Sequence, residues 1–328
     1  MPSSAVRRRL ATWATRLLQV GASLLVLYFL FREVDVDGLT SLWPRLHLGW
    51  LALALGLKAL TLLLHEVRLW VSLNPPRPPL WRVVAIGFAS ACLNLVLPGR
   101  AGDLAAVGML VRECRLGPGT AAAGVGVVAF LEAAMFGLTF AIALAVGAPR
   151  WKEVVGPEQW LQALSGVTGL TLLGIAIAVL GVMIVRRFMG DPAPEPAGTS
   201  PVVMVREALL QASTNLAAPL TLALNAGLAL VQVIGMLAAF AMLFPAVGID
   251  IPVPMLAAAG ILTVSSLASI LLPPSLGAGP AAAAVFVLGA FGLGQADALA
   301  YSVGWWAVSV GPSVVLGLPA FYGRGERL

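Results

Sequence analysis

The stretch at residues 120–148 is TAAAGVGVVAFLEAAMFGLTFAIALAVGA, an apolar run whose only charged residue is Glu132. About 20 apolar residues in a helix cross the hydrocarbon core of a bilayer, so this run is long enough to span a membrane. Further apolar runs occupy residues 17–31, 48–65, 83–98, 161–185, 219–244, 253–273 and 296–321. The sequence therefore predicts an all-α polytopic membrane protein.

The composition of the whole chain supports this interpretation. Of 328 residues, 59 % are AVILMFWYC and only 11 % are charged, against about 25 % in soluble domains. This excludes a secreted disulfide scaffold, a nucleic-acid-binding domain and an ordinary cytosolic enzyme, and it suffices for roughly seven to ten membrane segments. The net charge of +5 is attributed to basic residues on the cytoplasmic side. Because the chain has no P-loop, dinucleotide, nucleophile or zinc motif, we expect no cofactor, no metal and no enzymatic activity.

Two shorter apolar pieces, residues 104–111 and 281–291, each follow a Pro/Gly-rich break. Neither piece is long enough to span alone, so each predicts a broken or re-entrant helical hairpin buried in protein. Both halves of the chain have the same order of break, short helix, Gly-containing turn and long helix. The sequence therefore predicts two membrane repeats.

The distribution of basic residues predicts how these repeats are oriented. With the N-terminal arginines in the cytoplasm and both breaks treated as hairpins, nearly all basic residues fall inside, as the positive-inside rule requires. The exceptions are Lys58, within a helix, and four residues placed outside: Arg32, Arg45, Arg150 and Lys152. The first hairpin then enters from the cytoplasm and the second from outside, which makes the repeats inverted in topology. Both termini are expected in the cytoplasm.

The predicted domains follow from these runs. Residues 1–47 form an N-terminal helix and external loop, and residues 48–185 form the first membrane repeat plus a connecting helix. Residues 186–206 form a cytoplasmic linker, because their Pro-rich polar core has too little apolar content to fold alone. Residues 207–328 form the second membrane repeat. A signal peptide is the alternative for the first helix, but no small-residue cleavage site follows it.

Two charges lie in the middle of predicted membrane helices, Glu132 and Lys58. A charge at mid-bilayer costs at least ~2.5 kcal/mol, so such residues usually face a cavity or a partner. Three interpretations stay open: a structural Lys58–Glu132 ion pair, a Glu132 that contacts a head group or carries a proton, and a neutral buried Glu132.

The first Pro/Gly break contains a second group of candidates. Gly99 and Gly102 let the backbone approach a ligand closely, and Asp103 is expected to cap a helix that begins near Leu104. Arg100 adds a positive charge beside the N-terminus of that helix, which favours an anion such as a lipid phosphate. The alternative is a simple turn from which Arg100 extends to the interface.

Arg68 lies just after the run 48–65, where it is either an interfacial anchor or part of a head-group pocket with Arg100. The second half has no Lys or Arg between Arg206 and Arg324, so recognition of a charged head group must come from the first half. Helix–helix hydrogen bonds explain most of the uncharged polar residues in the apolar runs, among them Asn94, Asn225, Gln232 and Ser265.

Several of these motifs together resemble one known family. They are Arg68-Leu-Trp70, Asn94-Leu-Val-Leu-Pro-Gly-Arg-Ala-Gly-Asp103, Arg115-Leu-Gly117, Glu132 and Leu272-Pro-Pro-Ser-Leu-Gly277. The chain is similar, from about Leu17 to Tyr322, to the flippase-like membrane domain named after lysylphosphatidylglycerol synthase. The resemblance implies a bacterial or archaeal protein that moves or presents lipids across the cytoplasmic membrane. In the synthase a separate soluble domain transfers the aminoacyl group, and we expect no such domain in this chain. The chain departs from the family pattern at Ala133, usually Arg, and at Gly277-Ala-Gly-Pro280, usually Pro-Gly-Gly.

The function expected from the sequence is lipid translocation. The substrate is an anionic phospholipid or a polyprenyl-linked glycolipid, with its head group between the two hairpins. The partners are membrane lipids and not nucleic acid, and a homo-oligomer or a lipid-modifying enzyme is left open. The main alternative is a non-transporting scaffold or accessory subunit of such an enzyme, and an intramembrane enzyme is least favoured. The expected substrate-binding residues are Arg100, Gly99, Gly102, Asp103, Glu132, Arg68 and Lys58.

Overall fold

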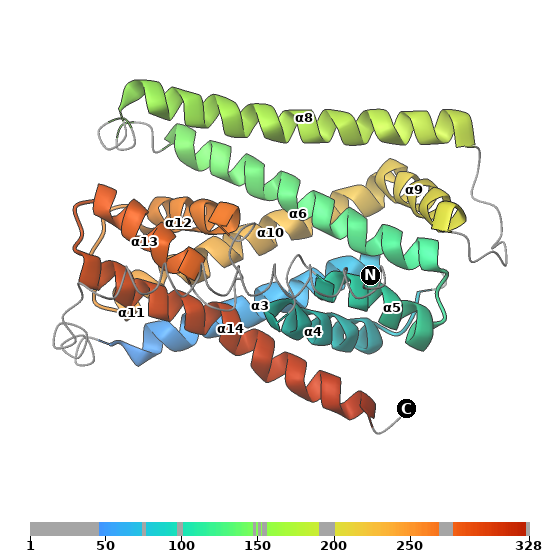
Figure 1. Cartoon of the computed structure of the whole chain (residues 1–328), viewed down its shortest axis with the longest axis horizontal. Helices are drawn as coiled ribbons and strands as arrows, with labels where there is room; N and C mark the ends of the chain where they lie inside the picture. Colours follow the sequence, from blue (N-terminus) through green and yellow to red (C-terminus); the bar gives the residue numbers. More distant parts are fainter. Residues whose placement is uncertain are drawn as a thin grey trace, which may run out of the picture. The chain divides into compact units, whose positions relative to one another are not determined.

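The computed structural model describes residues 46–73, 77–96, 101–146, 156–189, 201–268 and 278–325, together with positions 149 and 152. Over these residues the chain folds into helices and contains no strand (Figure 1). The helices are α3 (Leu48–Ser72), α4 (Leu80–Val96), α5 (Ala101–Cys114), α6 (Pro118–Val146), α8 (Pro157–Met189), α9 (Pro201–Ala217), α10 (Pro219–Ala241), α11 (Leu243–Ala246), α12 (Pro254–Ala268), α13 (Ala278–Ala290) and α14 (Gln295–Gly325). The predicted first helix, residues 17–31, lies outside the described residues.

Several of these helices are long and apolar enough to cross a membrane. Five such segments occur in the described part of the chain: Leu48–Ser72, Pro118–Val146, Leu164–Val185, Pro219–Ala246 and Gln295–Ala320. The apolar segment of α8 has none of its length buried in protein, and its Leu170 is 73 % exposed. Such a surface requires lipid around it. The prediction of an all-helical, multi-pass membrane protein is therefore confirmed.

The chain divides into two compact units. Unit 1 comprises Met1–Ala54 and Ala239–Val310, and unit 2 comprises Leu55–Ala238 and Gly311–Leu328. The division passes through α3, α10 and α14, so each of these long helices contributes to both units. The division of the chain into two successive repeats stays a prediction.

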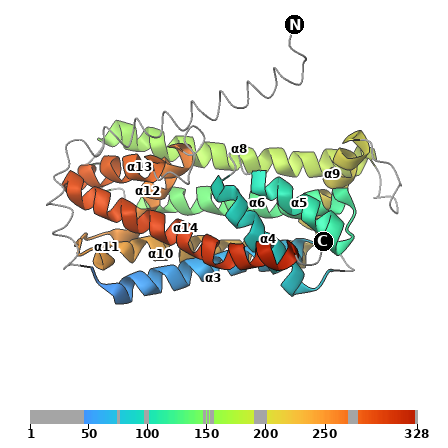
Figure 2. The ribbon, with the colours of Figure 1, turned by 60° about the horizontal axis from the view of Figure 1, so that its bottom comes forward.

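The core of unit 2 is an apolar cluster shared by α3, α4, α5 and α6. Its fully packed members are Leu69, Leu73, Val83, Ile86, Ala106, Leu110, Ala121 and Val128. In this unit α4 packs against α5, α5 against α6, and α6 against α8 and α9 (Figure 2). Four helices therefore enclose the region in which the sequence places most candidate residues.

The first Pro/Gly break separates α4 from α5, and residues 97–100 lie outside the described part. The short helix is longer than the predicted residues 104–111, because it begins at Ala101 and ends at Cys114. At 1.5 Å per residue its 14 residues extend for about 21 Å, which is still less than the ~30 Å of the hydrocarbon core. Arg115, in the left-handed region with φ of 56°, ends the helix, and Pro118 begins α6.

The helix α9 is absent from the sequence-based expectations. The range predicted as a linker, residues 186–206, is helical at both ends, because α8 continues to Met189 and α9 begins at Pro201. Packing against α6 and α8 holds α9 in place, and Gly119 of α6 lies so close to Glu207 that no side chain fits between them. It is also tied to α3, because the Asn215 side chain donates a 2.7 Å hydrogen bond to the carbonyl of Ser72.

Unit 1 is held by a buried aromatic cluster. The rings of Phe240 and Trp305 stack with centroids 3.5 Å apart, and those of Phe244 and Tyr301 stack at 4.4 Å. The hydroxyl of Tyr301 donates a 3.0 Å hydrogen bond to the Phe240 carbonyl. In the same unit α12 and α13, the helices on either side of the second Pro/Gly break, pack against each other. Residues 269–277 of that break lie outside the described part.

Candidate functional site

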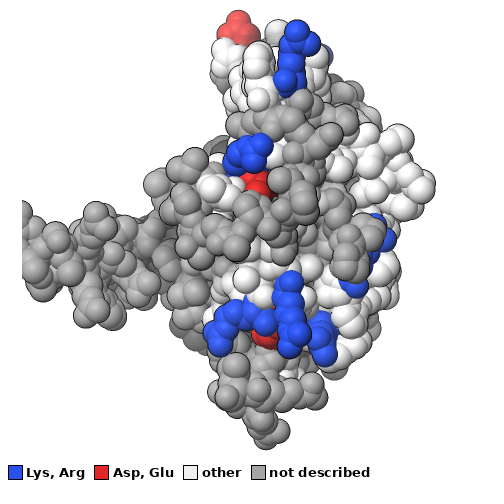
Figure 3. Space-filling view, turned by 90° about the vertical axis from the view of Figure 1, so that its right-hand side faces the viewer, with Lys and Arg blue, Asp and Glu red and all other residues white. Residues whose placement is uncertain are grey.

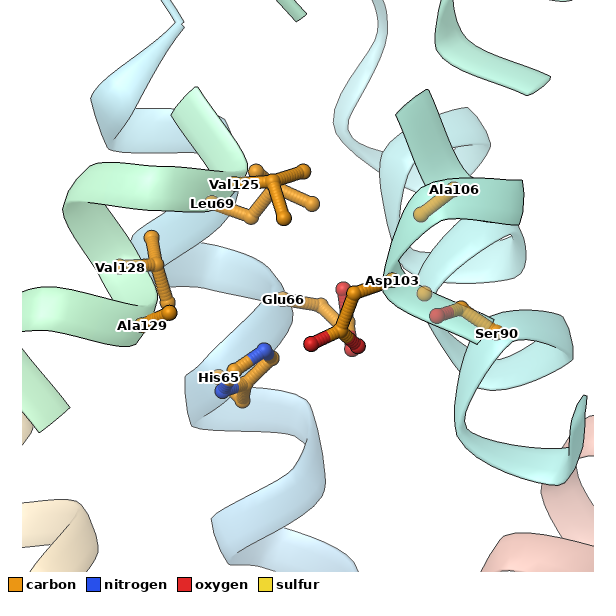
Figure 4. Close-up of a pocket in the computed structure, with 10 residues that line it drawn as sticks. His65, Glu66, Leu69, Ser90, Asp103, Ala106, Val125, Val128 and Ala129 are labelled. Carbon is orange, nitrogen blue, oxygen red and sulfur yellow. The ribbon is translucent and has the colours of Figure 1, made fainter. Parts of the chain in front are cut away.

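Unit 2 contains a cavity of about 190 Å³ formed by α3, α4, α5, α6 and α10. Its polar lining consists of Lys58, Thr61, His65, Glu66, Ser90, Asn94, Asp103, Glu132 and Gln232. A smaller neighbouring cavity of about 20 Å³ shares His65, Glu66, Ser90 and Asp103 with it, and Figure 4 shows this smaller cavity. Ionisable groups inside apolar helices are costly and usually functional, so the two cavities form the candidate site.

The polar lining from α3 follows the spacing of one helix face. Lys58, Thr61 and His65 are separated by three and four residues, which places them above one another on α3. Other positions of the same helix are apolar and open, as Leu53 and Leu60 are 50 % and 48 % exposed. The sequence of α3 thus fixes a polar face toward the cavity and an apolar face toward lipid.

A hydrogen bond joins the polar face of α3 to the membrane carboxylate of α6. Nδ1 of His65 lies 2.9 Å from Oε2 of Glu132, and the ring N–H donates to the carboxylate. About a quarter of each side chain is exposed. The pair therefore links α3 to α6 within the lining of the cavity.

Arg68 is a fully buried cation that ties three helices together. Its guanidinium donates a 2.7 Å hydrogen bond to the side-chain oxygen of Gln232 on α10 and a 3.0 Å bond to the carbonyl of Val128 on α6. Its Nη1 also lies 3.8 Å from Oε2 of Glu132. Because its side chain is 0 % exposed, Arg68 is not an interfacial anchor but a buried clamp beside the cavity.

The N-terminus of α5 is joined to α4 by Asn94. Its Oδ1 accepts a 2.8 Å hydrogen bond from the backbone N–H of Gly102, and its Nδ2 donates a 2.7 Å bond to Oδ1 of Asp103. The expected capping by Asp103 is therefore corrected, since Asp103 lies inside the first turn of α5 and Asn94 accepts the free N–H. This arrangement presents the Asp103 carboxylate to the cavity.

The described candidates from the sequence come together in unit 2. Lys58, Asp103 and Glu132 line the larger cavity, Arg68 contacts Glu132, and Gly102 lies against α4. The Lys58–Glu132 ion pair stays a prediction. The remaining two candidates, Gly99 and Arg100, lie outside the described residues.

The sequence-based candidates missed His65 and Glu66. The predicted apolar run ends at residue 65, whereas α3 continues to Ser72. The spacing of His65 from Lys58 was the available signal, since seven residues correspond to two helical turns. The helix–helix hydrogen bonds predicted for Asn94 and Gln232 are confirmed, and both residues also line the cavity.

Replacing Asn94 by Ala is expected to destabilise the protein by about 1–2 kcal/mol, because it removes both the cap of α5 and the donor to Asp103. Titration of the purified protein with sodium dodecyl sulfate in mixed micelles measures the loss. Thr214→Ala on the exposed side of α9 is the matched control and should change stability by less than ~0.5 kcal/mol. Equal stability of the two variants would contradict the role assigned to Asn94.

The fold and the cavity define a multi-pass helical membrane protein with an ionisable site among its helices. The chain belongs to the family described as the lysylphosphatidylglycerol synthase TM region, whose model matches residues 16–317. Membership in this family relates the chain to lipid handling. Comparisons with curated proteins and with solved structures give no match.

Proposed function

We propose that the chain is a flippase-like lipid translocator that binds the head group of an anionic phospholipid or a polyprenyl-linked glycolipid in the cavity of unit 2. The supporting observation is the cavity itself, which is lined by ionisable groups although its helices are apolar outside. Its 190 Å³ holds several waters of about 30 Å³ each, which suits a head group and leaves the acyl chains in the bilayer. In this proposal the lipid is released chemically unchanged, so the chain is not an enzyme.

The proposal includes two inverted-topology repeats, each with a broken or re-entrant hairpin. Its support is that each Pro/Gly break lies between two helices that pack together, α4 with α5 and α12 with α13. The second helix of each pair has only 14 or 13 residues, too few to cross a bilayer. Broken helices of this kind surround the substrate sites of many secondary transporters.

The proposal places the protein in a bacterial or archaeal cytoplasmic membrane with both termini in the cytoplasm. Basic side chains gather at one end of unit 2, the right-hand end in Figure 1, which faces the viewer in Figure 3. The exposed arginines of these helix ends and turns are Arg77, Arg82, Arg112, Arg115, Arg187 and Arg206. The positive-inside rule assigns such an end to the cytoplasm.

Reconstitution with fluorescent lipids tests the function. Vesicles that contain the protein should equilibrate a labelled anionic phospholipid between leaflets faster than empty vesicles, measured by chemical quenching of the outer leaflet. Glu132→Gln should slow lipid transfer about tenfold. The substitution weakens the charged hydrogen bond to His65 by ~1.4 kcal/mol, and a free-energy change of this size corresponds to a factor of about ten. Arg112→Gln, an exposed change on α5, is the control and should leave the rate unaltered.

Two results would count against the proposal. A wild-type rate equal to that of empty vesicles would reject translocation and favour the accessory-subunit alternative. Faster transfer that is unaffected by Glu132→Gln and by Arg100→Gln would retain translocation but reject the cavity as the head-group site. A labelled lipid with a zwitterionic head group, moved as fast as the anionic one, would reject the expected charge preference.

A further inference from the structure

The carboxyl group of Glu66 is a buried acceptor that lines both cavities. Glu66 is only 3 % exposed, and among the residues that the structure describes its Oε2 has no hydrogen-bond partner. A buried acceptor is costly until it receives a hydrogen bond. The last torsion of a Glu side chain is broad, so a rotation about it brings either carboxyl oxygen to the cavity.

Helix α4 leaves room for this carboxyl group. The group occupies the space beside Gly87, where any side chain would collide with it. Gly87, Ser90 and Asn94 are separated by three and four residues, which places them on one face of α4, and all three line the larger cavity. The glycine therefore sets the Glu66 carboxyl group against the α4 wall of the cavity.

A hydroxyl group lies on the same wall. Ser90 is 5 % exposed and lines both cavities, as Glu66 does. In Figure 4 the Glu66 side chain extends from α3 toward Ser90, whose oxygen points back toward it. A serine hydroxyl can donate a hydrogen bond, and a carboxylate oxygen can accept one. The two side chains together offer a donor and an acceptor to a molecule in the cavity.

The neighbouring donors have other acceptors. Both terminal nitrogens of Arg68 donate to Gln232 and Val128, and His65 is bonded to Glu132. The side-chain N–H of Asn94 donates to Asp103. A donor that enters the cavity with the substrate can therefore satisfy Glu66.

We propose that Glu66 and Ser90 form a subsite that recognises a free hydroxyl group on the head group of the translocated lipid, as a glycerol or a sugar provides. The hydroxyl group donates to Glu66 and accepts from Ser90, and no covalent bond forms or breaks. The inference rests on the proposed function and narrows its substrates to lipids with hydroxylated head groups.

A hydroxyl group fits this pair better than an ammonium group does. A hydroxyl both donates and accepts, which matches a carboxylate beside a serine, whereas an ammonium group has no acceptor for the Ser90 proton. The cavity also has positive charge already, from Lys58 in its lining and Arg68 beside it. A neutral hydroxyl adds no further positive charge there.

Native mass spectrometry of the full chain, released from detergent micelles, tests recognition separately from transport. The probes are phosphatidylglycerol and phosphatidylmethanol, which carry the same charge but differ in the hydroxyl groups of the glycerol. We expect phosphatidylglycerol to bind about tenfold more tightly, because its analogue leaves a buried acceptor unpaired. A polyprenyl phosphate hexose and the methyl ester of polyprenyl phosphate form a second pair, which tests a sugar in the same way.

Three variants remove or displace the recognising groups. E66M retains a long unbranched side chain without a carboxyl group, so it should remove the preference within each pair. S90A should reduce the preference. G87A keeps the carboxyl group, but its Cβ atom displaces it, so the preference should again fall. The matched controls change exposed or open positions and should leave the preference unaltered: E113M, S165A and G108A.

The outcomes identify the group that Glu66 binds. A preference that E66M removes supports the subsite, and the pair that shows it tells a glycerol from a sugar. Equal binding within both pairs, or a preference that E66M and G87A leave unchanged, would overturn the proposal. Tighter binding of phosphatidylethanolamine than of phosphatidylglycerol, lost in E66M, would assign the carboxylate to an ammonium group instead. If E66M does not fold, G87A decides the result.

Transport in vesicles separates this inference from the proposed function. Hydroxyl-dependent binding without lipid transfer would reject translocation and retain the subsite. Lipid transfer without any hydroxyl-dependent binding would retain translocation and reject the subsite.

Discussion

Arg68→Leu is expected to destabilise the protein by about 3–5 kcal/mol, the usual cost of removing one partner from a buried charged network. The variant leaves the side-chain oxygen of Gln232 and the carbonyl of Val128 without their donor, and it removes the cation 3.8 Å from Glu132. Leucine fills most of the space but supplies no hydrogen bond. The loss should appear as a lower midpoint in the titration with sodium dodecyl sulfate.

The matched control is Arg82→Leu, which removes an exposed arginine that lies over Trp81. Its effect should stay below ~1 kcal/mol, because exposed charges contribute little. The loss of stability in Arg68→Lys should fall between those of Arg68→Leu and Arg82→Leu, since one ammonium group does not reproduce the two-donor geometry of the guanidinium.

A double variant identifies the source of the loss. If the orphaned carboxylate is the main cost, adding Glu132→Gln to Arg68→Leu should recover part of the stability, and the double-mutant cycle gives the coupling between them. A loss below ~1 kcal/mol for Arg68→Leu alone would show that Arg68 does not act as the buried clamp.

The membrane character of the chain was predictable because it depends on local apolar content. The run at residues 120–148 needs no partner to be recognised, and Glu132 stands out in it as a single charge. The spans of α3, α6, α10 and α14 agree with the predicted runs to within a few residues, except that α3 continues to Ser72. Arg68 falls within this extra length, which explains why an interfacial position was a reasonable alternative for it.

The arrangement of the site was not predictable from one sequence. The partners of Arg68 lie 60 and 164 residues away along the chain, and nothing in the local sequence selects Gln232 over other polar residues. The burial of Glu66 could not be predicted from the local sequence, because its carboxyl group lies over Gly87 of another helix. The same reasoning applies to α9, whose first residues fall in the predicted linker and whose Asn215 has its acceptor in α3, 143 residues away along the chain.

Gly102→Ala is expected to separate α5 from α4 and to cost about 1–3 kcal/mol. A Cβ atom at this position would collide with the backbone carbonyl oxygen of Ser90 and would lie only 2.5 Å from Oδ1 of Asn94. The Ser90 carbonyl belongs to the backbone of α4, so it can move away from the new Cβ atom only if α4 and α5 separate. The displacement would also stretch the hydrogen bond by which Asn94 holds Asp103.

Gly108→Ala on the same helix provides a control of opposite sign. Nothing lies within 4 Å of a Cβ atom at Gly108, and alanine favours a helix over glycine by up to ~1 kcal/mol. We therefore expect Gly102→Ala to lower, and Gly108→Ala to maintain or raise, the midpoint of unfolding in mixed micelles. If both variants gain stability, the close contact between α4 and α5 is not present in the membrane protein, and the position assigned to Asp103 is wrong with it.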